Sequence, residues 1–178
     1  MRIYGNRRLE TLPGRAIRPT PSRVREALFD RWQGQIQDCR WLDLCAGSGA
    51  MGAEALCRGA SWVVGIERSG RACRAIAHNW QRLAPSPHAF QLLRGGVCER
   101  LPALAGQQFD RAYFDPPYGS GLYQPVLSAI AALELLAPNG ELAVEYDPQA
   151  WEAASFGDLR LVRCKPYGST ALAFYRRS

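Results

Sequence analysis

The sequence predicts an α/β fold, with a Rossmann-like, mostly parallel sheet and helices on both faces. From residue 40 onward, short apolar segments alternate with amphipathic segments, which is the pattern of successive βαβ units. After Trp151 the alternation stops, and two apolar segments joined at Tyr167-Gly168-Ser169 predict an antiparallel C-terminal hairpin. The 178 residues suit a single domain, 1–178, with its α/β core over 40–178.

The region before the core divides into two parts. Residues 1–20 mix arginine, glycine and proline, so we expect a basic arm or a short hairpin. Thr20 followed by Pro21 is a typical helix start, with Thr20 as the cap and Pro21 at the first helical position. Apolar residues at helical spacing then predict a helix over 21–33.

Each element of the core follows from its apolar pattern and from the turn residues that bound it. The predicted strands are 40–44, 62–67, 89–94, 109–114, 141–146, 159–165 and 170–176. The predicted helices run from the glycine-rich turn to about 58, from 70 to 83, from 97 to 104 and from 123 to 136. Pro138-Asn139-Gly140 predicts the turn into the fifth strand.

Composition excludes several classes of protein. Hydrophobic residues are 47% and charged residues 21%, as in a globular chain that can bury a core. No apolar run approaches the roughly 18–20 residues of a membrane span, and no apolar segment follows the basic start as in a secretory signal. The six cysteines form no Cys-x-x-Cys pair and only two histidines are present, so we expect reduced thiols, no metal, no membrane partner and a cytoplasmic location.

The charge favours an anionic partner. The net charge is +6, and 21 of the 22 basic residues are arginine, since Lys165 is the only lysine. Arginine binds phosphate as a bidentate fork and stacks on bases, although a GC-rich genome explains the same bias equally well. The densest basic stretch lies before residue 24, where phosphate contact competes with a solvated arm; it includes Arg7, Arg8, Arg15, Arg18 and Arg23.

A glycine-rich turn follows the first predicted core strand. Gly47, Gly49 and Gly52 spell G-x-G-x-x-G between a strand and a helix, where free backbone N–H groups can meet a ligand. Glu67 ends the next strand, at a distance along the chain that suits a carboxylate on an adenosine ribose.

The turn fits either a dinucleotide or S-adenosylmethionine, and Asp43 favours the second. A carboxylate beside the turn suits a cationic amino-acid tail but would repel a pyrophosphate. A purely structural turn is the third interpretation. The candidate cofactor contacts here are Asp43, Ala46, Gly47, Gly49 and Glu67.

Asp115-Pro116-Pro117-Tyr118 ends the fourth predicted strand, at the edge where open α/β sheets bind ligands. The prolines fix the backbone and leave carbonyl acceptors. Asp115 and the Pro116 carbonyl could accept both hydrogens of an exocyclic amine and turn its lone pair toward a methyl group, while Tyr118 stacks on the base. A proline-ended strand with a solvated aspartate is the alternative.

Together, these motifs resemble motifs I and IV of class I S-adenosylmethionine-dependent amino-methyltransferases. Residues 17–30, residues 43–56 and the C-terminal hairpin resemble, more narrowly, the RsmD family of small-subunit ribosomal RNA (guanine-N2)-methyltransferases. The resemblance covers nearly the whole chain. It implies a seven-stranded methyltransferase sheet with an antiparallel last strand, and methyl transfer from S-adenosylmethionine to the exocyclic N2 of a guanine.

The resemblance also implies roles for individual residues. Gly47 and Gly49 would lie under the cofactor, Glu67 on its ribose, and Asp115, Pro116, Pro117 and Tyr118 around the guanine. Arg18, Thr20 and Arg23 would lie near the mouth of the active site. Arg94-Gly95-Gly96-Val97 stands where related enzymes often carry an acidic or amide residue, so the backbone of Gly96 and Val97 would have to contact the adenine.

Three other functions fit parts of the pattern. The acceptor amine could be adenine N6 or a protein glutamine, the chain could be a non-catalytic RNA-binding module, or the turn could belong to an NAD oxidoreductase. We expect a monomer that acts on small-subunit ribosomal RNA, in an assembled or partly assembled particle.

Overall fold

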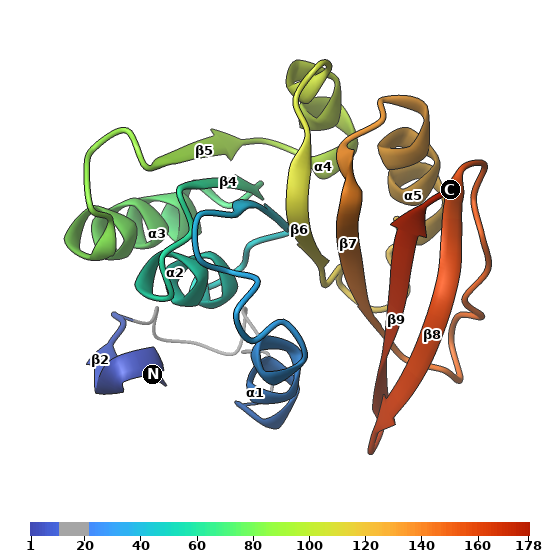
Figure 1. Ribbon diagram of the computed structural model, residues 1–178, viewed down its shortest axis with the longest axis horizontal. Coiled ribbons are helices and arrows are strands. Elements are labelled where there is room, and N and C mark those ends of the chain that lie inside the picture. Colours follow the sequence, from blue (N-terminus) through green and yellow to red (C-terminus); the bar gives the residue numbers. More distant parts are fainter. Residues whose placement is uncertain (11–21) are drawn as a thin grey trace.

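A computed structural model describes residues 1–10 and 22–178 of the chain. Seven strands form one sheet in the order β5-β4-β3-β6-β7-β9-β8 (Figure 1). Neighbouring strands from β5 to β7 are parallel, and β9 is antiparallel to both β7 and β8, which confirms the predicted fold class. The strands are β3 (Arg40–Leu44), β4 (Trp62–Glu67), β5 (Phe90–Arg94), β6 (Phe109–Phe114), β7 (Leu136–Tyr146), β8 (Leu159–Tyr167) and β9 (Thr170–Arg177).

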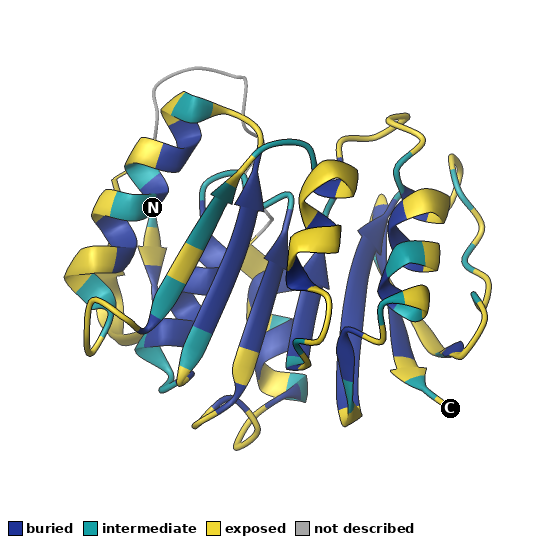
Figure 2. Cartoon of the chain, turned by 90° about the horizontal axis from the view of Figure 1, so that it is seen from above, coloured by how far each residue is buried: buried dark blue, intermediate teal, exposed yellow. Residues whose placement is uncertain are grey.

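Helices cover both faces of the sheet, and a separate apolar core lies under each layer. One core packs beneath α1, α2 and α3, and the other beneath α4, α5 and the 3-10 turn η2. Figure 2 shows the central strands buried and the helices exposed on their outer sides. The helices are α1 (Ser22–Arg31), α2 (Ala50–Cys57), α3 (Gly70–Leu83), α4 (Val97–Arg100), η2 (Leu101–Leu104) and α5 (Tyr123–Ala132).

The N-terminal residues form the short hairpin that was one of the two expectations for them. It consists of β1 (Arg2–Ile3), the 3-10 turn η1 (Tyr4–Asn6) and β2 (Arg7–Arg8). Buried Arg25 of α1 bonds Glu54 of α2 at 2.8 Å and the Arg2 carbonyl at 3.1 Å. Hairpin, α1 and α2 are therefore joined at one guanidinium.

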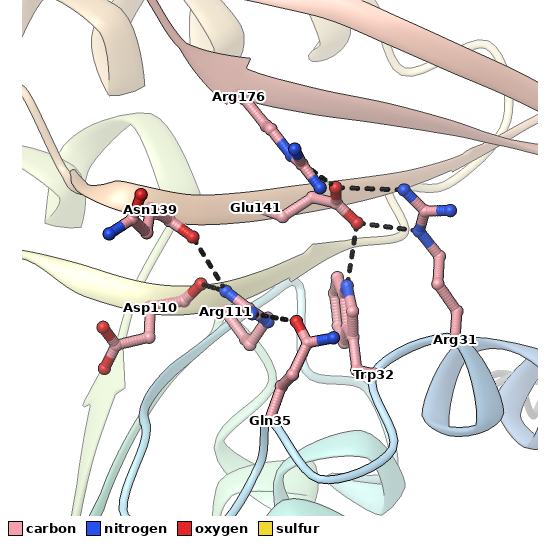
Figure 3. Close-up of polar contacts among 8 residues, drawn as sticks. All are labelled: Arg31, Trp32, Gln35, Asp110, Arg111, Asn139, Glu141 and Arg176. Carbon is pink, nitrogen blue, oxygen red and sulfur yellow. Dashed lines mark hydrogen bonds and ion pairs between the residues drawn. The ribbon is translucent and has the colours of Figure 1, made fainter.

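A buried carboxylate fastens the other end of α1 to the sheet (Figure 3). Glu141 of β7 accepts two hydrogen bonds from Arg31, at 2.8 and 3.0 Å, and one each from Trp32 Nε1 and Arg176, both at 2.8 Å. Burial alone would raise the pKa of Glu141, but these hydrogen bonds bring it below its ordinary value. The paired carboxylate fixes the direction of α1 across β7 and β9.

The structure corrects two boundaries near β7. The helix predicted over 123–136 ends at Ala132, because Glu134 adopts a left-handed φ of 51° that breaks the helix. The turn predicted at Pro138-Asn139-Gly140 is wrong, since these residues lie inside β7, which begins at Leu136. They form an irregularity in its pairing with β6, where the register shifts between Phe109 and Arg111.

Two further boundaries differ slightly. The helix predicted over 97–104 is a single α-helical turn followed by a 3-10 turn, because Pro102 cannot donate the backbone hydrogen bond of a continuing α-helix. The helix predicted over 21–33 ends at Arg31.

Candidate functional site

The predicted cofactor and acceptor residues meet at one edge of the sheet. Strands β4, β3 and β6 are adjacent and parallel, so their carboxyl ends lie side by side. Glu67 ends β4, the glycine-rich turn follows β3, and Asp115 follows β6. We call this the carboxyl edge, and the opposite one the amino edge.

The turn after β3 is held open by left-handed residues and backbone bonds. Cys45, Gly47 and Gly49 have φ values of 60°, 56° and 71°, a conformation that glycine adopts at low cost. The Ala46 N–H donates to the Ile66 carbonyl of β4 at 2.9 Å, which ties the turn to the neighbouring strand. Ala46, Gly47 and Gly49 thus form one ordered loop leading into α2.

Glu67 is oriented by two backbone amides. Its Oε2 accepts from the Gly47 N–H at 2.8 Å, and its Oε1 accepts from the Ser69 N–H at 2.7 Å. A carboxylate has about four acceptor sites, so each oxygen can accept one further hydrogen bond. That capacity fits the two hydroxyls of a ribose.

Asp43 lies beneath the turn, inside the protein. It is 1% exposed, and its Oδ2 accepts from the Gly52 N–H in the first turn of α2 at 2.9 Å. Burial raises the pKa of Asp43 from 3.8 to about 8, against the opposing effect of this hydrogen bond. The structure thus gives Asp43 a structural bond to the helix that carries the turn; its predicted influence on a cationic ligand would act across the turn.

A single indole ring fills a slot made by three glycines. Trp80 of α3 is fully buried, and its Nε1 donates to the Gly49 carbonyl at 2.8 Å. A Cβ at Gly52 would lie 2.3 Å from Trp80 Cζ2, and one at Gly65 would lie 2.6 Å from Cη2. The third glycine of the motif therefore serves packing of α2 on α3. The sequence pattern gives no sign of this bond between Trp80 and the turn.

The Asp-Pro-Pro-Tyr segment is partly open to solvent. Asp115 is half-buried, Pro116 is buried, and Tyr118 is 42% exposed, as a base-stacking ring requires. The Tyr118 hydroxyl donates to Thr170 Oγ1 at 3.5 Å, across to the start of β9.

Behind this segment lies a buried polar cluster that the sequence did not reveal. Glu145 of β7 is 2% exposed; it accepts from the Tyr113 hydroxyl at 2.5 Å and from Thr170 Oγ1 at 3.2 Å. Tyr113 lies two residues before Asp115 on β6. Glu145 therefore bonds the strand that leads into Asp115, and Thr170 bonds Tyr118. The cluster thus links β7 and β9 to the two predicted substrate residues.

The pKa of the Cys45 thiol reflects the carboxyl groups at the carboxyl edge. Burial, together with the nearby carboxyl groups of Glu67, Asp115 and Asp43, raises this pKa to about 12. The thiol therefore stays protonated near neutral pH, as expected for a packing residue rather than a nucleophile. Cys98 and Cys164, in contrast, are exposed.

The loop predicted to contact an adenine lies next to Glu67. The Gly95 N–H donates to the Glu67 carbonyl at 3.0 Å, which places the loop beside the predicted ribose position. The Gly96 N–H donates to Glu99 Oε2 at 3.2 Å, and Val97 is buried.

The predicted RNA-binding residues separate. Arg7 and Arg8 are exposed, but Arg7 bonds Cys57 at the C-terminal end of α2, toward the amino edge. Arg23 lies at the carboxyl edge, where its Nη2 donates to the Tyr167 carbonyl at 2.6 Å. Arg15, Arg18 and Thr20 lie outside the described residues.

The residues at the carboxyl edge fit S-adenosylmethionine. The oriented Glu67 carboxylate offers acceptors for ribose hydroxyls, and the carboxylates of Glu67 and Asp115 near the turn suit a cationic ligand. Over residues 1–10 and 22–178, no cluster of three or more histidine, cysteine or acidic side chains could hold a metal ion. Within the same described stretches, no helix has the length and apolar character to cross a membrane.

Comparisons with known proteins identify the family of this chain. The family model described as Conserved hypothetical protein 95 matches residues 1–176. The protein named Ribosomal RNA small subunit methyltransferase D of Escherichia coli K12 is 29% identical over 181 aligned positions, which cover 99% of this chain and 90% of that protein.

Solved structures share the fold. A hypothetical protein from Thermus thermophilus superposes with a TM-score of 0.80 at 27% identity, covering 99% of both chains. Magnesium protoporphyrin IX methyltransferase from Synechocystis, solved with bound S-adenosylmethionine, superposes with a TM-score of 0.66 at 12% identity, covering 88% of this chain and 79% of that one. At that identity, the likeness shows the fold alone.

Proposed function

This chain belongs to the RsmD family, whose model is described as Conserved hypothetical protein 95, and on that premise we propose that it methylates the exocyclic N2 of a guanine in small-subunit ribosomal RNA, with S-adenosylmethionine as donor. One observation carries the proposal. The Glu67 carboxylate, the glycine-rich turn and Asp115 follow three adjacent strands at the carboxyl edge, and Glu67 bonds Gly47 directly.

On the cofactor side, the chain supplies acceptors and a shaped turn. S-adenosylmethionine, when bound, supplies a methyl group on a positively charged sulfur. Glu67 would accept the ribose hydroxyls with its remaining acceptor sites, and its two backbone bonds hold it ready for this. Asp43 and the backbone of Ala46, Gly47 and Gly49 would border the amino-acid end, and the backbone of Gly96 and Val97 would border the adenine.

On the acceptor side, Asp115 and the Pro116 carbonyl accept the two hydrogens of the guanine amine. This directs the nitrogen lone pair toward the methyl carbon. Transfer of the methyl group to this nitrogen would release one of the two amine protons, which the Asp115 carboxylate or solvent would accept. Positioning contributes more than basicity in such a transfer. Pro117 stiffens the segment, and Tyr118 stacks on the base, an interaction worth roughly 1–3 kcal/mol.

Transfer of a labelled methyl group from S-adenosylmethionine tests the proposal. Unmodified small-subunit particles, their deproteinised RNA and duplex DNA serve as parallel acceptors, and nucleoside chromatography identifies the product. We expect N2-methylguanosine at one site with the wild-type chain, acting as a monomer. N6-methyladenosine, or label in protein, would instead assign a different acceptor amine.

Asp115→Ala is the matched variant, with calorimetric binding of S-adenosylmethionine as its folding control. We expect transfer to be abolished while cofactor binding persists, because Asp115 touches the amine and not the cofactor. Unchanged turnover in this variant would refute its assigned role. RNA binding by a wild-type chain that binds no cofactor would favour the non-catalytic RNA-binding module.

A further inference from the structure

The C-terminal hairpin carries an exposed surface that the proposed reaction does not use. Strand β8 is the edge strand of the sheet (Figure 1), and its five consecutive residues 162–166 are all exposed. Val162 is 47% exposed, which is high for an apolar residue in a strand. An open strand of this kind needs either a partner or protection.

Strand register places two cations of β8 on the side of the sheet that α1 covers. Lys165 is opposite Leu172 and Arg163 is opposite Phe174. Paired residues point to the same face of a sheet, and Leu172 and Phe174 belong to the core beneath α1, α2 and α3. Lys165 and Arg163 therefore project on the α1 side.

A bulge brings a third cation to the same side. The register shifts between Leu161 and Arg163, so Val162 is an extra residue and Arg160 pairs with Arg176. Arg176 reaches Glu141, the carboxylate that fastens α1 (Figure 3). Arg160 thus shares the α1 side with Arg163, although strict alternation along an unbroken strand would place them on opposite faces.

Arg23 of α1 extends this set to the carboxyl edge. Its guanidinium packs on the hairpin turn, where a Cβ at Gly168 would lie 2.4 Å from Arg23 Nη2. The Lys165 ammonium lies 5.2 Å from the centroid of the Tyr167 ring, and Tyr167 is the first residue of the same turn. We call Arg23, Lys165, Arg163 and Arg160 the hairpin cations.

The charge of this surface is not compensated locally. Residues 159–178 contain five arginines and lysines and no aspartate or glutamate. Arg176 and Arg177 form ion pairs with Glu141 and Glu134. The hairpin cations enter none of the ion pairs found within residues 1–10 and 22–178.

The hairpin turn lies next to the residue assigned to base stacking. Thr170 begins β9 directly after the turn, and its Oγ1 accepts a hydrogen bond from the Tyr118 hydroxyl. A strand of nucleic acid whose base stacks on Tyr118 would thus have its backbone close to the hairpin cations. We propose that the α1-side face of the β8–β9 hairpin binds the RNA phosphates that flank the target guanine; this rests on the proposed function.

Removing two of these charges tests the surface. In Arg163→Gln/Lys165→Gln, the slope of log affinity against log salt should fall by about 0.7–0.9 for each phosphate that the chain no longer neutralises, hence by about 1.4–1.8 for two. The probe is deproteinised small-subunit RNA, with affinity measured from low to moderate salt. Thermal melting confirms that the variant folds.

The matched control is Arg40→Gln/Arg82→Gln, which removes two exposed arginines at the amino edge and leaves the net charge equal to that of the test variant. The control should keep the wild-type slope within about 0.5, since neither side chain lies near Tyr118. An equal decrease of the slope in both variants would show that only net charge matters and would overturn the proposal.

Edge protection is the competing role of these charges, because lysine and arginine on an edge strand prevent pairing between copies. It predicts that the test variant self-associates, seen by sedimentation, with an unchanged RNA slope; that result would also overturn the proposal. If the wild-type chain binds no RNA, the proposed substrate fails together with this surface. If it binds with an unaltered slope in the test variant, the surface alone fails.

Discussion

Replacement of Gly52 by alanine tests whether the third glycine of the turn motif is there for packing. A Cβ at this position would lie 2.3 Å from Trp80 Cζ2 and 2.8 Å from Cη2, where carbon atoms prefer about 3.5–4.0 Å. The indole is fully buried and held by the Gly49 carbonyl, so it has no open direction in which to move. Overpacking of this kind costs about 1–3 kcal/mol.

Intrinsic helix propensity predicts the opposite sign. Within a helix, alanine is about 1 kcal/mol more favourable than glycine, and Gly52 lies within α2. We expect the clash to prevail because more than about 1 Å is missing from an ordinary carbon–carbon separation. A net decrease of about 1–2 kcal/mol in the free energy of unfolding should lower Tm by about 2–8 °C for a chain of this size.

Thermal melting followed by circular dichroism measures this decrease, and Trp80→Phe supplies the second side of a double-mutant cycle. In the Trp80→Phe background, Gly52→Ala should cost at least about 1 kcal/mol less, because the outer ring of the indole is gone. S-adenosylmethionine should also bind more weakly to Gly52→Ala, since the displaced indole carries the Gly49 carbonyl with it. A Tm equal to or above that of the wild type, or strictly additive costs, would refute the reasoning.

Three further predictions concern the site. Glu67→Gln removes charge-assisted bonds worth about 1.5–3 kcal/mol, so calorimetry should show S-adenosylmethionine binding weakened about 10- to 150-fold; a change below about threefold would contradict the ribose role. Asp43 binds its proton more tightly in the folded chain, so the free energy of unfolding should fall as pH rises from 3.8 to about 8; denaturant unfolding of Asp43→Asn should show a flatter decline, and parallel curves would argue against the raised pKa. Thr170→Val leaves Glu145 short of a donor, so transfer should fall at constant cofactor affinity while Thr170→Ser restores it; reduced transfer in both variants would point to volume rather than to the hydroxyl.

The sequence predicted most of the sheet because glycine and proline residues mark the ends of its strands. The strand at 40–44 ends in a glycine turn and that at 109–114 ends in two prolines, and both have the predicted limits. Pro138-Asn139-Gly140 carries the same local signal as a true turn. In the structure these three residues instead form an irregular segment of β7 that pairs with β6. This pairing is a tertiary effect, which the local sequence does not encode.

The candidate site shows the same division between local and distant information. Strand ends predicted Glu67 and Asp115 at one edge of the sheet, and the sheet order places them after the two strands that flank β3. The sequence did not predict the Glu145 cluster, because its members come from three strands and are brought together by the register between β7 and β9. Arg7 and Arg23 are close in sequence, yet Arg7 contacts Cys57 at the C-terminal end of α2 and Arg23 contacts Tyr167 at the hairpin turn.

The uneven accessibility of the thiols gives the chain built-in reporters. Cys39 is buried and Cys45 is half-buried, and the pKa of each is raised to about 12, mainly by burial, so a mild thiol reagent at neutral pH should react slowly with both. Cys98 lies in the first turn of α4 beside the adenine loop, and Cys164 lies on β8 between Arg163 and Lys165. One accessible sulfur therefore lies near each of the two proposed binding regions; Cys164 is opposite Ala173, so its side chain is on the other face of β8 from the hairpin cations. Dyes attached there could follow arrival of the methyl donor and of the nucleic acid as separate signals in one molecule.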